Sequence, residues 1–505
     1  MATAPMQFGF TFGKPQGQRR VEDEDPFRVL VLADLGCAMS ARGATPLARR
    51  RALSVDIDNL DAVFRRLKPC VALQLDGKAV TIEFESLEDF HPDRLFAHLA
   101  PFVALRQLRG ALADPAQFRR AAASLGASPS TAGAPDVPAA PDAGADAGDI
   151  ERLLGRKPAA APVAVAGPGG SGIDTWLRSV VAPHVVQDLS SEQAPLIAAV
   201  DAAIAEQMRR VLHDPAFQAL EANWRNVERL VRELDLGDTL QLMLLDATRD
   251  ELAQDFQAHA SDLSESALHH HLCGPLTQAP DGAPWSLLVS DLAFGADLCE
   301  LQMLATLGAM AGRAGAPLLA AARLSLIGCA HIGQLAEPKH WQPLVSDVAA
   351  YWSALRQSPV APWVGLALPR LLARLPYGKN SDPVVSFAFE EQQPRAHDAY
   401  LWGSPAFSLG LLAGQSFLEA GWGMELGAGQ DVDDLPGHVF REDGESHQQA
   451  GAEVTLNEPA ADAVLRQGVM ALLSYRNRNA ARLLLWQSIA SPAQALRGPW
   501  ADAGR

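Results

Sequence analysis

Three consecutive histidines, His269, His270 and His271, are the residues whose type most directly suggests metal binding. Imidazole nitrogens are common zinc ligands. Neighbouring positions on a helix point in different directions, however, so three consecutive rings do not converge on one ion. We therefore expect these histidines to lie in a surface loop, and we predict no metal site.

Two aspartates follow short apolar runs that are typical of buried strands. Asp34 follows residues 27–33, and Asp291 follows residues 285–290. Enzymes of the α/β class place catalytic groups at such strand ends. An aspartate there also caps the helix or loop that follows, and this is the role we expect. Cys37 has no base nearby in the sequence, so a structural thiol is expected.

The remaining patterns do not favour catalysis either. The glycine-rich run GPGGSG at residues 167–172 lacks the Gly-Lys-Ser/Thr ending and the preceding strand of a phosphate loop. The five cysteines are widely spaced and form no Cys-x-x-Cys pair. We predict no catalytic residue, no cofactor and no metal. An α/β enzyme stays open as an alternative, motivated only by the strand-end aspartates.

A group of charged and aromatic residues near residue 380 is a candidate structural or interface site. Arg370 and Arg374 lie beside Tyr377 and near Glu390 and Glu391. Arginine pairs with carboxylates in dry sites only when partners satisfy its donors. The sequence leaves two interpretations open, which are buried or interfacial ion pairs and a solvated arginine face.

Composition limits the kinds of partner. With 42 basic and 59 acidic residues in 505, the chain carries a formal charge of −17. Such a chain repels phosphate backbones and acidic lipid surfaces, so we expect no nucleic acid partner. The most apolar window, residues 301–322, is interrupted by Gly308, Gly312, Arg313 and Pro317, so no membrane insertion is expected. A soluble cytoplasmic protein is predicted.

Strands alternate with helices along much of the chain, which predicts an α/β fold with mixed, largely parallel sheets and helices on both faces. Asp76-Gly77 between two apolar runs predicts a β-hairpin. Helices are expected at residues 298–313 and 464–473, among others. Trp224 shares one face of a helix with Phe217 and Leu220.

The length predicts two or more domains. Residues 1–25 form a flexible lead-in, and residues 26–125 form a first domain. Residues 126–172 are rich in Ala, Pro and Gly and are expected to be a linker. Within it, residues 149–157 are either a transient helical turn, our expectation, or a docking peptide. Residues 173–505 form the second domain.

Several segments of the first domain resemble the small contractile-sheath subunit of type VI secretion, called TssB or VipA. They are PFRVLVLADL at residues 26–35, SVDIDNLDAVFRRLKP at 54–69, and the segment at 82–115 that contains SLEDFHPD. The resemblance covers about residues 26–125.

The second domain resembles the large sheath subunit, called TssC or VipB. The segments include HDPAFQALEANWRNVERLV at residues 213–231, PWSLLVSDLAFG at 284–295, and VGLALPRLLARLPYG at 364–378. FAFEE at 387–391, AYLWGSPAF at 399–407 and LPGHVF at 435–440 follow in this order, and the second of them contains Trp402. Trp224 and Trp402 are therefore further candidate structural or interface residues.

The resemblance implies a contractile-sheath-like module and a structural function. Sheath protomers stack around an inner tube through strands that augment a neighbour's sheet. An AAA+ unfoldase recycles the sheath. The expected partners are sheath subunits or further copies of this chain, the inner tube protein, and a baseplate or unfoldase.

Relative to the family, the chain ends before the large subunit's further C-terminal domain. This keeps a second interpretation open, namely a non-polymerising, sheath-like cap, adaptor or assembly regulator.

Overall fold

The computed structural model describes residues 10–12, 21–36, 45–125, 176–177, 180–181, 193–274, 283–427, 430–475 and 478–501. Cys37 and the predicted linker at residues 126–172, with its glycine-rich run, lie outside them. The chain divides into two compact units. One comprises Met1–Leu95 with Arg209–Arg505, and the other comprises Phe96–Met208. Each unit is described by itself.

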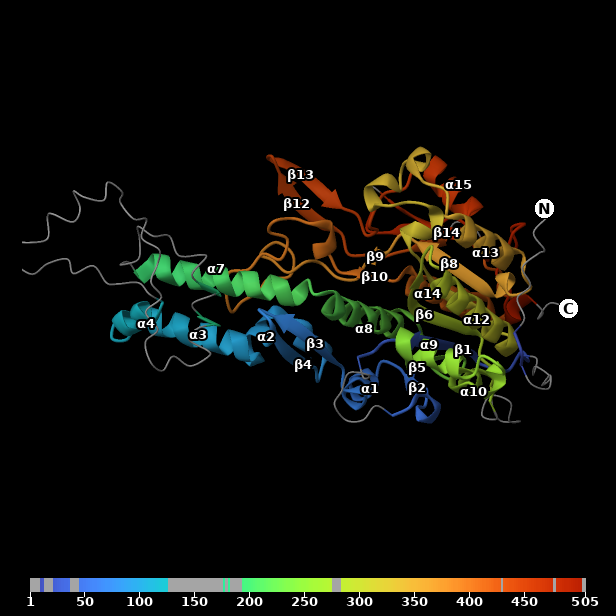
Figure 1. Ribbon diagram of the computed structural model, residues 1–505, viewed down its shortest axis with the longest axis horizontal. Coiled ribbons are helices and arrows are strands. Elements are labelled where there is room, and N and C mark those ends of the chain that lie inside the picture. Colours follow the sequence, from blue (N-terminus) through green and yellow to red (C-terminus); the bar gives the residue numbers. More distant parts are fainter. Residues whose placement is uncertain are drawn as a thin grey trace, which may run out of the picture. The chain divides into compact units, whose positions relative to one another are not determined.

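The first unit is built on a nine-stranded sheet in which neighbouring strands are mostly parallel (Figure 1). Only the pairs β2–β5, β14–β15 and β11–β15 are antiparallel. The strands, in spatial order, are β11 (Gln430–Val432), β15 (Ala481–Leu483), β14 (Val469–Ser474), β8 (Val364–Leu368), β7 (Leu318–Ala322), β6 (Leu287–Phe294), β1 (Phe27–Ala33), β5 (Leu240–Asp246) and β2 (Leu53–Val55). This confirms the predicted α/β fold with a mixed, largely parallel sheet.

Strand β1 lies inside this sheet, between β5 and β6. Phe27 pairs with Leu240 on one side, and Val29 pairs with Leu287 on the other. The sequence FRVLVLA has almost no polar face, and all of β1 except Arg28 is buried. A strand of this kind needs neighbours on both edges and cover on both faces. The N-terminal and C-terminal parts of the chain therefore share one sheet.

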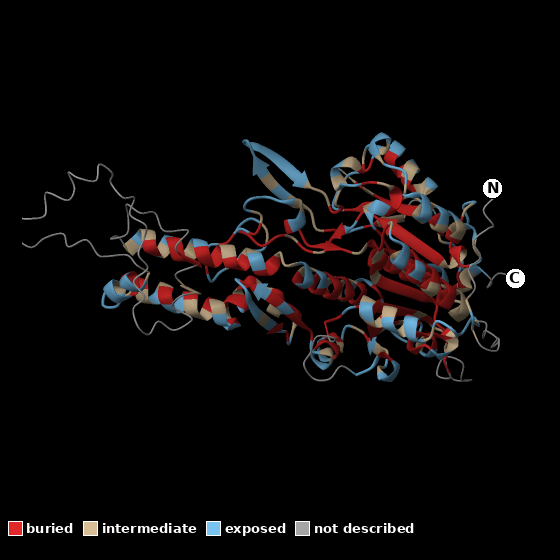
Figure 2. Ribbon diagram, in the orientation of Figure 1, coloured by how far each residue is buried: buried red, intermediate tan, exposed pale blue. Residues whose placement is uncertain are grey.

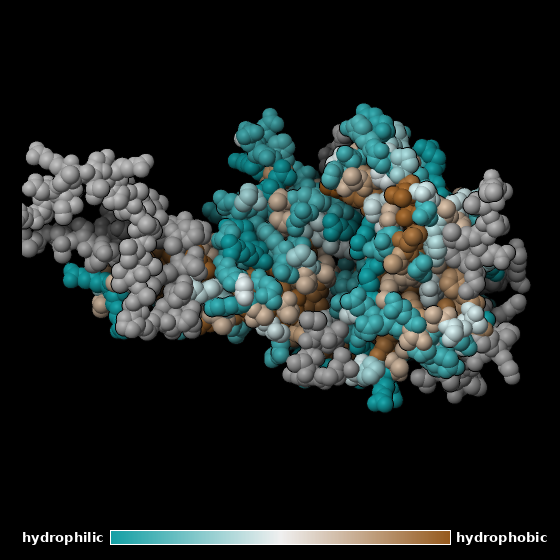
Figure 3. All heavy atoms as spheres, in the orientation of Figure 1, coloured by the Kyte–Doolittle hydropathy of each residue, from teal (hydrophilic) through white to brown (hydrophobic). Residues whose placement is uncertain are grey.

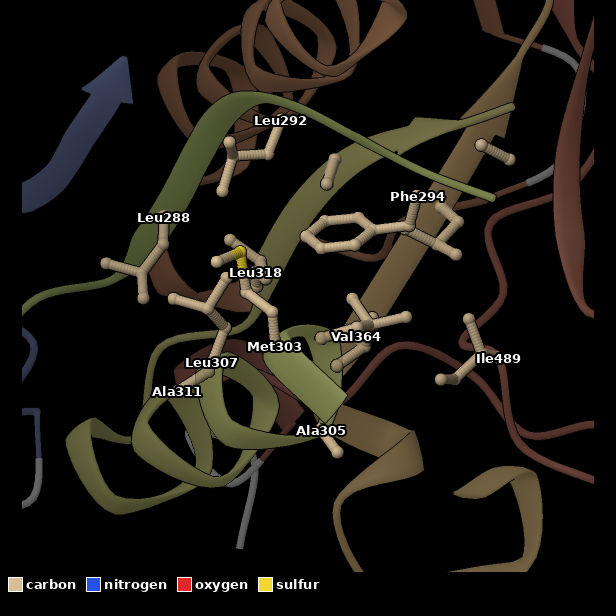
Figure 4. Packing of buried hydrophobic residues seen from close by; sticks show 14 of the residues in the cluster. Leu288, Leu292, Phe294, Met303, Ala305, Leu307, Ala311, Leu318, Val364 and Ile489 are labelled. Atoms are coloured by element: carbon tan, nitrogen blue, oxygen red, sulfur yellow. The ribbon is translucent and has the colours of Figure 1, made fainter. Parts of the chain in front are cut away.

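Helices cover both faces of the sheet. Adjacent residues of β6 point to opposite sides. Leu288 faces α12 (Leu298–Ala314), where it packs near Met303 and Leu307 (Figure 4). Val289 faces α14 (Pro405–Ala420), and it leaves so little space that a Cβ atom at Gly410 would lie 2.8 Å from it. Figure 2 shows that the central strands are buried as a result.

The other helices of the first unit are, in chain order, α1 (Leu60–Leu67), α2 (Pro92–His98) as far as Leu95, α8 (Pro215–Glu233), α9 (Arg249–Ala258), α10 (Ala267–Cys273), α13 (Ser346–Gln357) and α15 (Glu458–Arg466). Helix α8 begins where Asp214 accepts hydrogen bonds from the N–H groups of Ala216 and Phe217. Proline at its first position costs no internal hydrogen bond. The residues that α8 carries are central to the site described below.

Two hairpins stand outside the main sheet. The predicted one pairs β3 (Cys70–Leu75) with β4 (Lys78–Glu83), and Asp76 and Gly77 in its turn both have positive φ. The second pairs β12 (His438–Glu442) with β13 (Glu445–Gln449) around Asp443-Gly444, also at positive φ. Hydrophilic, exposed residues cover this second hairpin (Figures 2 and 3). Two-residue turns of this kind match the right-handed twist of paired strands.

The second unit contains α3 (Ala100–Ala113), α4 (Phe118–Ser124) and most of α7 (Gln193–Leu212). Arg109 on α3 donates to both carboxylate oxygens of Asp201 on α7, at 2.5 and 3.1 Å. Gln193 donates to the carbonyl oxygen of Leu112 at 2.7 Å. These hydrogen bonds join α3 to α7.

Two local expectations are wrong. The three histidines lie on helix α10 rather than in a loop, because the Ser266 side chain caps this helix and His269 joins its buried face. Residues 464–473 are not one helix. Helix α15 ends at Arg466, Gly468 takes a φ of +80°, and the apolar run that follows is strand β14. Gly468 permits this turn because it has no side chain.

Candidate functional site

Arg374 is the centre of a buried ion cluster in the first unit. It follows the short strand β9 (Leu371–Leu372), and its side chain is 9% exposed. Its Nε and Nη2 donate to the two carboxylate oxygens of Glu221, at 2.7 and 3.2 Å. Its Nη1 and Nη2 donate to the two oxygens of Glu391, at 2.8 and 3.1 Å. One planar guanidinium therefore makes bidentate hydrogen bonds to two carboxylates.

Tyr377 closes this cluster. Its ring centroid lies 4.0 Å from Cζ of Arg374, within cation–π range. Its backbone N–H donates to Glu391 at 2.7 Å, and its hydroxyl donates to Glu221 at 3.4 Å. Arg225 lies 3.5 Å from Glu221, so two arginines face two glutamates and the formal charges balance.

The surroundings keep Arg374 charged and the phenol of Tyr377 neutral. Burial alone lowers the pKa of Arg374, but Glu221 and Glu391 reverse this and raise it well above its ordinary value. Burial, followed by the charge of Glu221, raises the pKa of Tyr377, so its phenol stays protonated. The ion pairs and hydrogen bonds of Arg374 therefore join α8 to the loops at residues 374–377 and 391.

The other predicted residues lie in different surroundings. Arg370 is half exposed and pairs with Glu453, not with either glutamate of the FAFEE segment. Glu390 is exposed, and its carboxylate accepts the backbone N–H of Lys379 at 3.1 Å. Trp402 is buried, donates to the carbonyl oxygen of His397 and stacks on its ring.

Trp224 lies on α8 and is completely buried. Its ring centroid is 4.4 Å from that of Phe64 on α1, and its indole N–H donates to the carbonyl oxygen of Leu35 at 3.2 Å. Both partners belong to the N-terminal 125 residues, so Trp224 joins the two parts of the chain.

Sequence reasoning missed Glu221 and Glu453. The signal for Glu221 was available, because it occupies the buried stripe of α8 beside Leu220 and Trp224. A charged residue in an apolar stripe needs a buried counter-charge. No comparable signal marks Glu453, which is far from Arg370 in the sequence.

A second polar cluster lies at the carboxyl ends of β1, β5 and β6. Asp246 accepts the backbone N–H of Leu35 at 2.8 Å. Asp291, which is inside β6 rather than after it, accepts the backbone N–H of Asp34 at 3.1 Å. Asn223 of α8 donates to Asp291 at 2.8 Å and to the carbonyl oxygen of Asp34 at 2.9 Å.

Asp246 and Asp291 link neighbouring segments through hydrogen bonds to the backbone after β1. Their burial makes the ionised form of both carboxylates unfavourable. Burial raises the pKa of both Asp246 and Asp291 to about 6. Asp34 accepts the backbone N–H of Gly36, as in an Asx turn. Among the described residues, no histidine lines the clefts beside this cluster, and no group of three or more His, Cys, Asp or Glu side chains could hold a metal ion.

We expect the double variant Asp246→Asn/Asp291→Asn to raise the thermal midpoint by about 2–5 °C at pH 7.5. Because both folded-state pKa values lie above the unfolded value of 3.8, the two carboxylates cost stability fully above about pH 6, and this cost falls progressively as the pH drops from about 6 to 3.8. The gain over wild type should shrink as pH falls from 7.5 to 5, measured by thermal unfolding.

The comparison with wild type at each pH is necessary because burial lowers the pKa of His269 and His438, and these groups destabilise the fold as pH falls. A gain that is equal at pH 7.5 and pH 5, or no gain at either, would contradict the assignment.

Comparison with known proteins agrees with this geometry. Residues 194–490 match the VipB family model, described as the EvpB/VC_A0108 tail sheath N-terminal domain. Residues 10–120 match the type VI secretion system VipA model, described as VipA, VC_A0107 or Hcp2. The chain is similar to the type VI secretion system sheath protein TssC1 of Pseudomonas aeruginosa, with 28% identity over 325 residues.

That match covers 63% of this chain and 64% of the relative, so the chain spans less than two thirds of the relative's length. No helix among the described residues has the length and apolar character needed to cross a bilayer. With a VipB match over more than half of its length and a VipA match before it, the chain belongs to the type VI secretion tail sheath family.

Proposed function

We propose that this protein is a structural component of a type VI secretion contractile sheath. In this proposal residues 26–125 act as the small subunit and residues 173–505 as the large subunit, joined by the linker at 126–172. The protein acts in the cytoplasm without catalysis. Its partners are sheath subunits or further copies of itself, the inner tube protein, and a baseplate or AAA+ unfoldase.

The observation that carries the proposal is the position of β1. This strand comes from the part that matches VipA, and it lies between β5 and β6 from the part that matches VipB. Two separate subunits would have to meet to complete such a sheet. Fusing them replaces that encounter with an intramolecular one at high effective concentration.

A second candidate is a sheath-like accessory that binds a sheath without propagating it. The edge strands favour it, because β2 and β11 contain three residues each. Short edge strands offer few free backbone groups to an incoming strand, and proteins use them to limit edge-to-edge pairing. Such a protein would join a sheath end or interface and form no tube itself.

Electron microscopy of the purified full-length chain distinguishes these functions. We expect it to form sheath-like tubes alone, with inner tube protein, or together with a conventional small and large subunit pair. The pair without this chain is the control. Binding to existing sheaths without tubes of its own would favour the accessory, and no association in any mixture would contradict sheath membership of either kind.

A further inference from the structure

A cleft of about 680 Å³ opens at the carboxyl ends of the central strands. Its lining includes Ala293 of β6, Ala322 of β7 and Leu368 of β8, together with the adjacent face of α8. A second cleft of about 480 Å³ shares Asn223 and Asp291 with it. All these residues belong to the first unit. In open α/β sheets this edge is where ligands are usually bound.

Part of the wall of the larger cleft consists of small side chains beside one aromatic ring: Ala219, Ala222, Ala293, Ala321, Ala322 and Trp402. Larger side chains, among them Leu324, Arg323 and Arg370, line the rest. Alanine walls leave depth for a long, thin side chain, and they offer its methylene groups an apolar surface. An indole ring adds a surface that attracts cations.

Asp291 supplies an anchor in this cleft. Its Oδ2 accepts from Asp34 and Asn223, as described above. Its Oδ1 is buried and accepts no hydrogen bond within the described part of the chain. A buried carboxylate oxygen without a donor is costly. An occupant that brings a positively charged donor would remove this cost.

The arginines that line the two clefts have other partners. Arg249 donates to the carbonyl oxygen of Ala293 at 2.5 Å and lies 3.7 Å from Glu300. Arg323 pairs with the same Glu300 at 3.1 Å. Arg370, which also lines the cleft, pairs with Glu453. None of them donates to Oδ1 of Asp291, so the position of a donor there is open.

We propose that this cleft receives an arginine or lysine side chain of a neighbouring protein, with its methylene stem against the alanine residues and its charged head at the carboxylate of Asp291, which lines both clefts. That the neighbour is a sheath subunit rests on the proposed function. The cleft itself is a property of the single chain, so its chemistry can be tested without any assembly.

The test uses butylguanidinium chloride, which has an alkyl stem and a guanidinium head, against the neutral butylurea. We expect saturable binding of butylguanidinium to the full-length chain by calorimetry at pH 7.5, and about tenfold weaker binding of butylurea, since hydrogen bonds to a charged group are the stronger ones. Asp291→Asn should abolish the preference. Asp347→Asn, an exposed carboxylate on α13, should leave it unchanged.

A second variant separates loss of the site from loss of the fold. Ala219 is exposed on α8 and lines both clefts, so Ala219→Leu should block the probe while leaving Asp291 and the thermal midpoint intact. Butylguanidinium that does not bind wild type, or binds Asp291→Asn or Ala219→Leu equally well, overturns the proposal. If the chain binds the probe but joins no sheath, the proposed chemistry of the cleft is supported and only the proposed sheath function is refuted.

Discussion

Replacing Arg374 with leucine should lower the free energy of unfolding by about 3–5 kcal/mol. The guanidinium is the shared partner of Glu221 and Glu391, which are 0% and 1% exposed. Its removal leaves two buried carboxylates without their shared counter-charge, with Arg225 3.5 Å from Glu221 and His213 3.8 Å from Glu391. Denaturant or thermal unfolding of the full-length variant measures the loss as a shift in midpoint.

Two further variants test the reason for this loss. Arg232→Leu removes an ion pair with Glu228 in which the arginine is 66% exposed, and it should cost at most about 1 kcal/mol. Adding Glu221→Gln and Glu391→Gln to Arg374→Leu should recover part of the stability, because the two buried carboxylates are then neutral and Arg225 still lies 3.6 Å from Glu228. If Arg374→Leu lowers the free energy of unfolding no more than Arg232→Leu does, the buried cluster does not stabilise the fold.

Replacing Trp224 with alanine should cost about 3–5 kcal/mol. The substitution removes a completely buried ring, its contact with Phe64 and its hydrogen bond to Leu35. Because α8 is otherwise regular and well capped, the helix should persist and leave a cavity at this point. The loss should therefore fall mainly on the contact between the VipA-like and VipB-like parts.

A graded series separates packing from hydrogen bonding at this position. Trp224→Phe keeps most of the ring contact and loses the bond to Leu35, so about 1 kcal/mol should be lost beyond the volume effect. Unfolding midpoints of wild type, Trp224→Phe and Trp224→Ala should fall in that order. Equal midpoints for wild type and Trp224→Ala would show that this contact contributes nothing.

The sequence was sufficient to predict the elements with strong local signals. Strand β1 lies where its apolar run at residues 27–33 predicted it, and α12 extends over the expected helix with Asp297 as its N-terminal cap. The hairpin at Asp76-Gly77 follows from the one dipeptide that favours positive φ at both turn positions. These features depend on a few neighbouring residues, which a sequence displays directly.

Other features depend on residues that are distant in the sequence. The Asp443-Gly444 turn carries the same hairpin signal as Asp76-Gly77, but its flanking strands are polar and exposed, so the apolar alternation that would have marked them is absent. Strand β14, VMALLS, is a short apolar run that periodicity cannot distinguish from a buried helix. Only its pairing with β8 makes it a strand.

The candidate site shows the same limit. Arg374, Tyr377 and Glu391 are close in sequence and meet in the structure, whereas their partner Glu221 lies 153 residues before Arg374. Arg370 was grouped with the same glutamates, but its carboxylate is Glu453, 83 residues away. Local spacing indicated that the arginines needed acids. Which acid pairs with each arginine depends on residues that are 83 and 153 positions away in the sequence.

The most direct measurement of the central claim is a cut in the linker. A protease site placed within residues 126–172 of the full-length chain separates the VipA-like part from the VipB-like part. Because β1 pairs with β5 and with β6, we expect the two fragments to stay together in size-exclusion chromatography under native conditions and to separate only when unfolded. Two folded fragments that elute separately after cleavage would contradict the account that both parts form one sheath module.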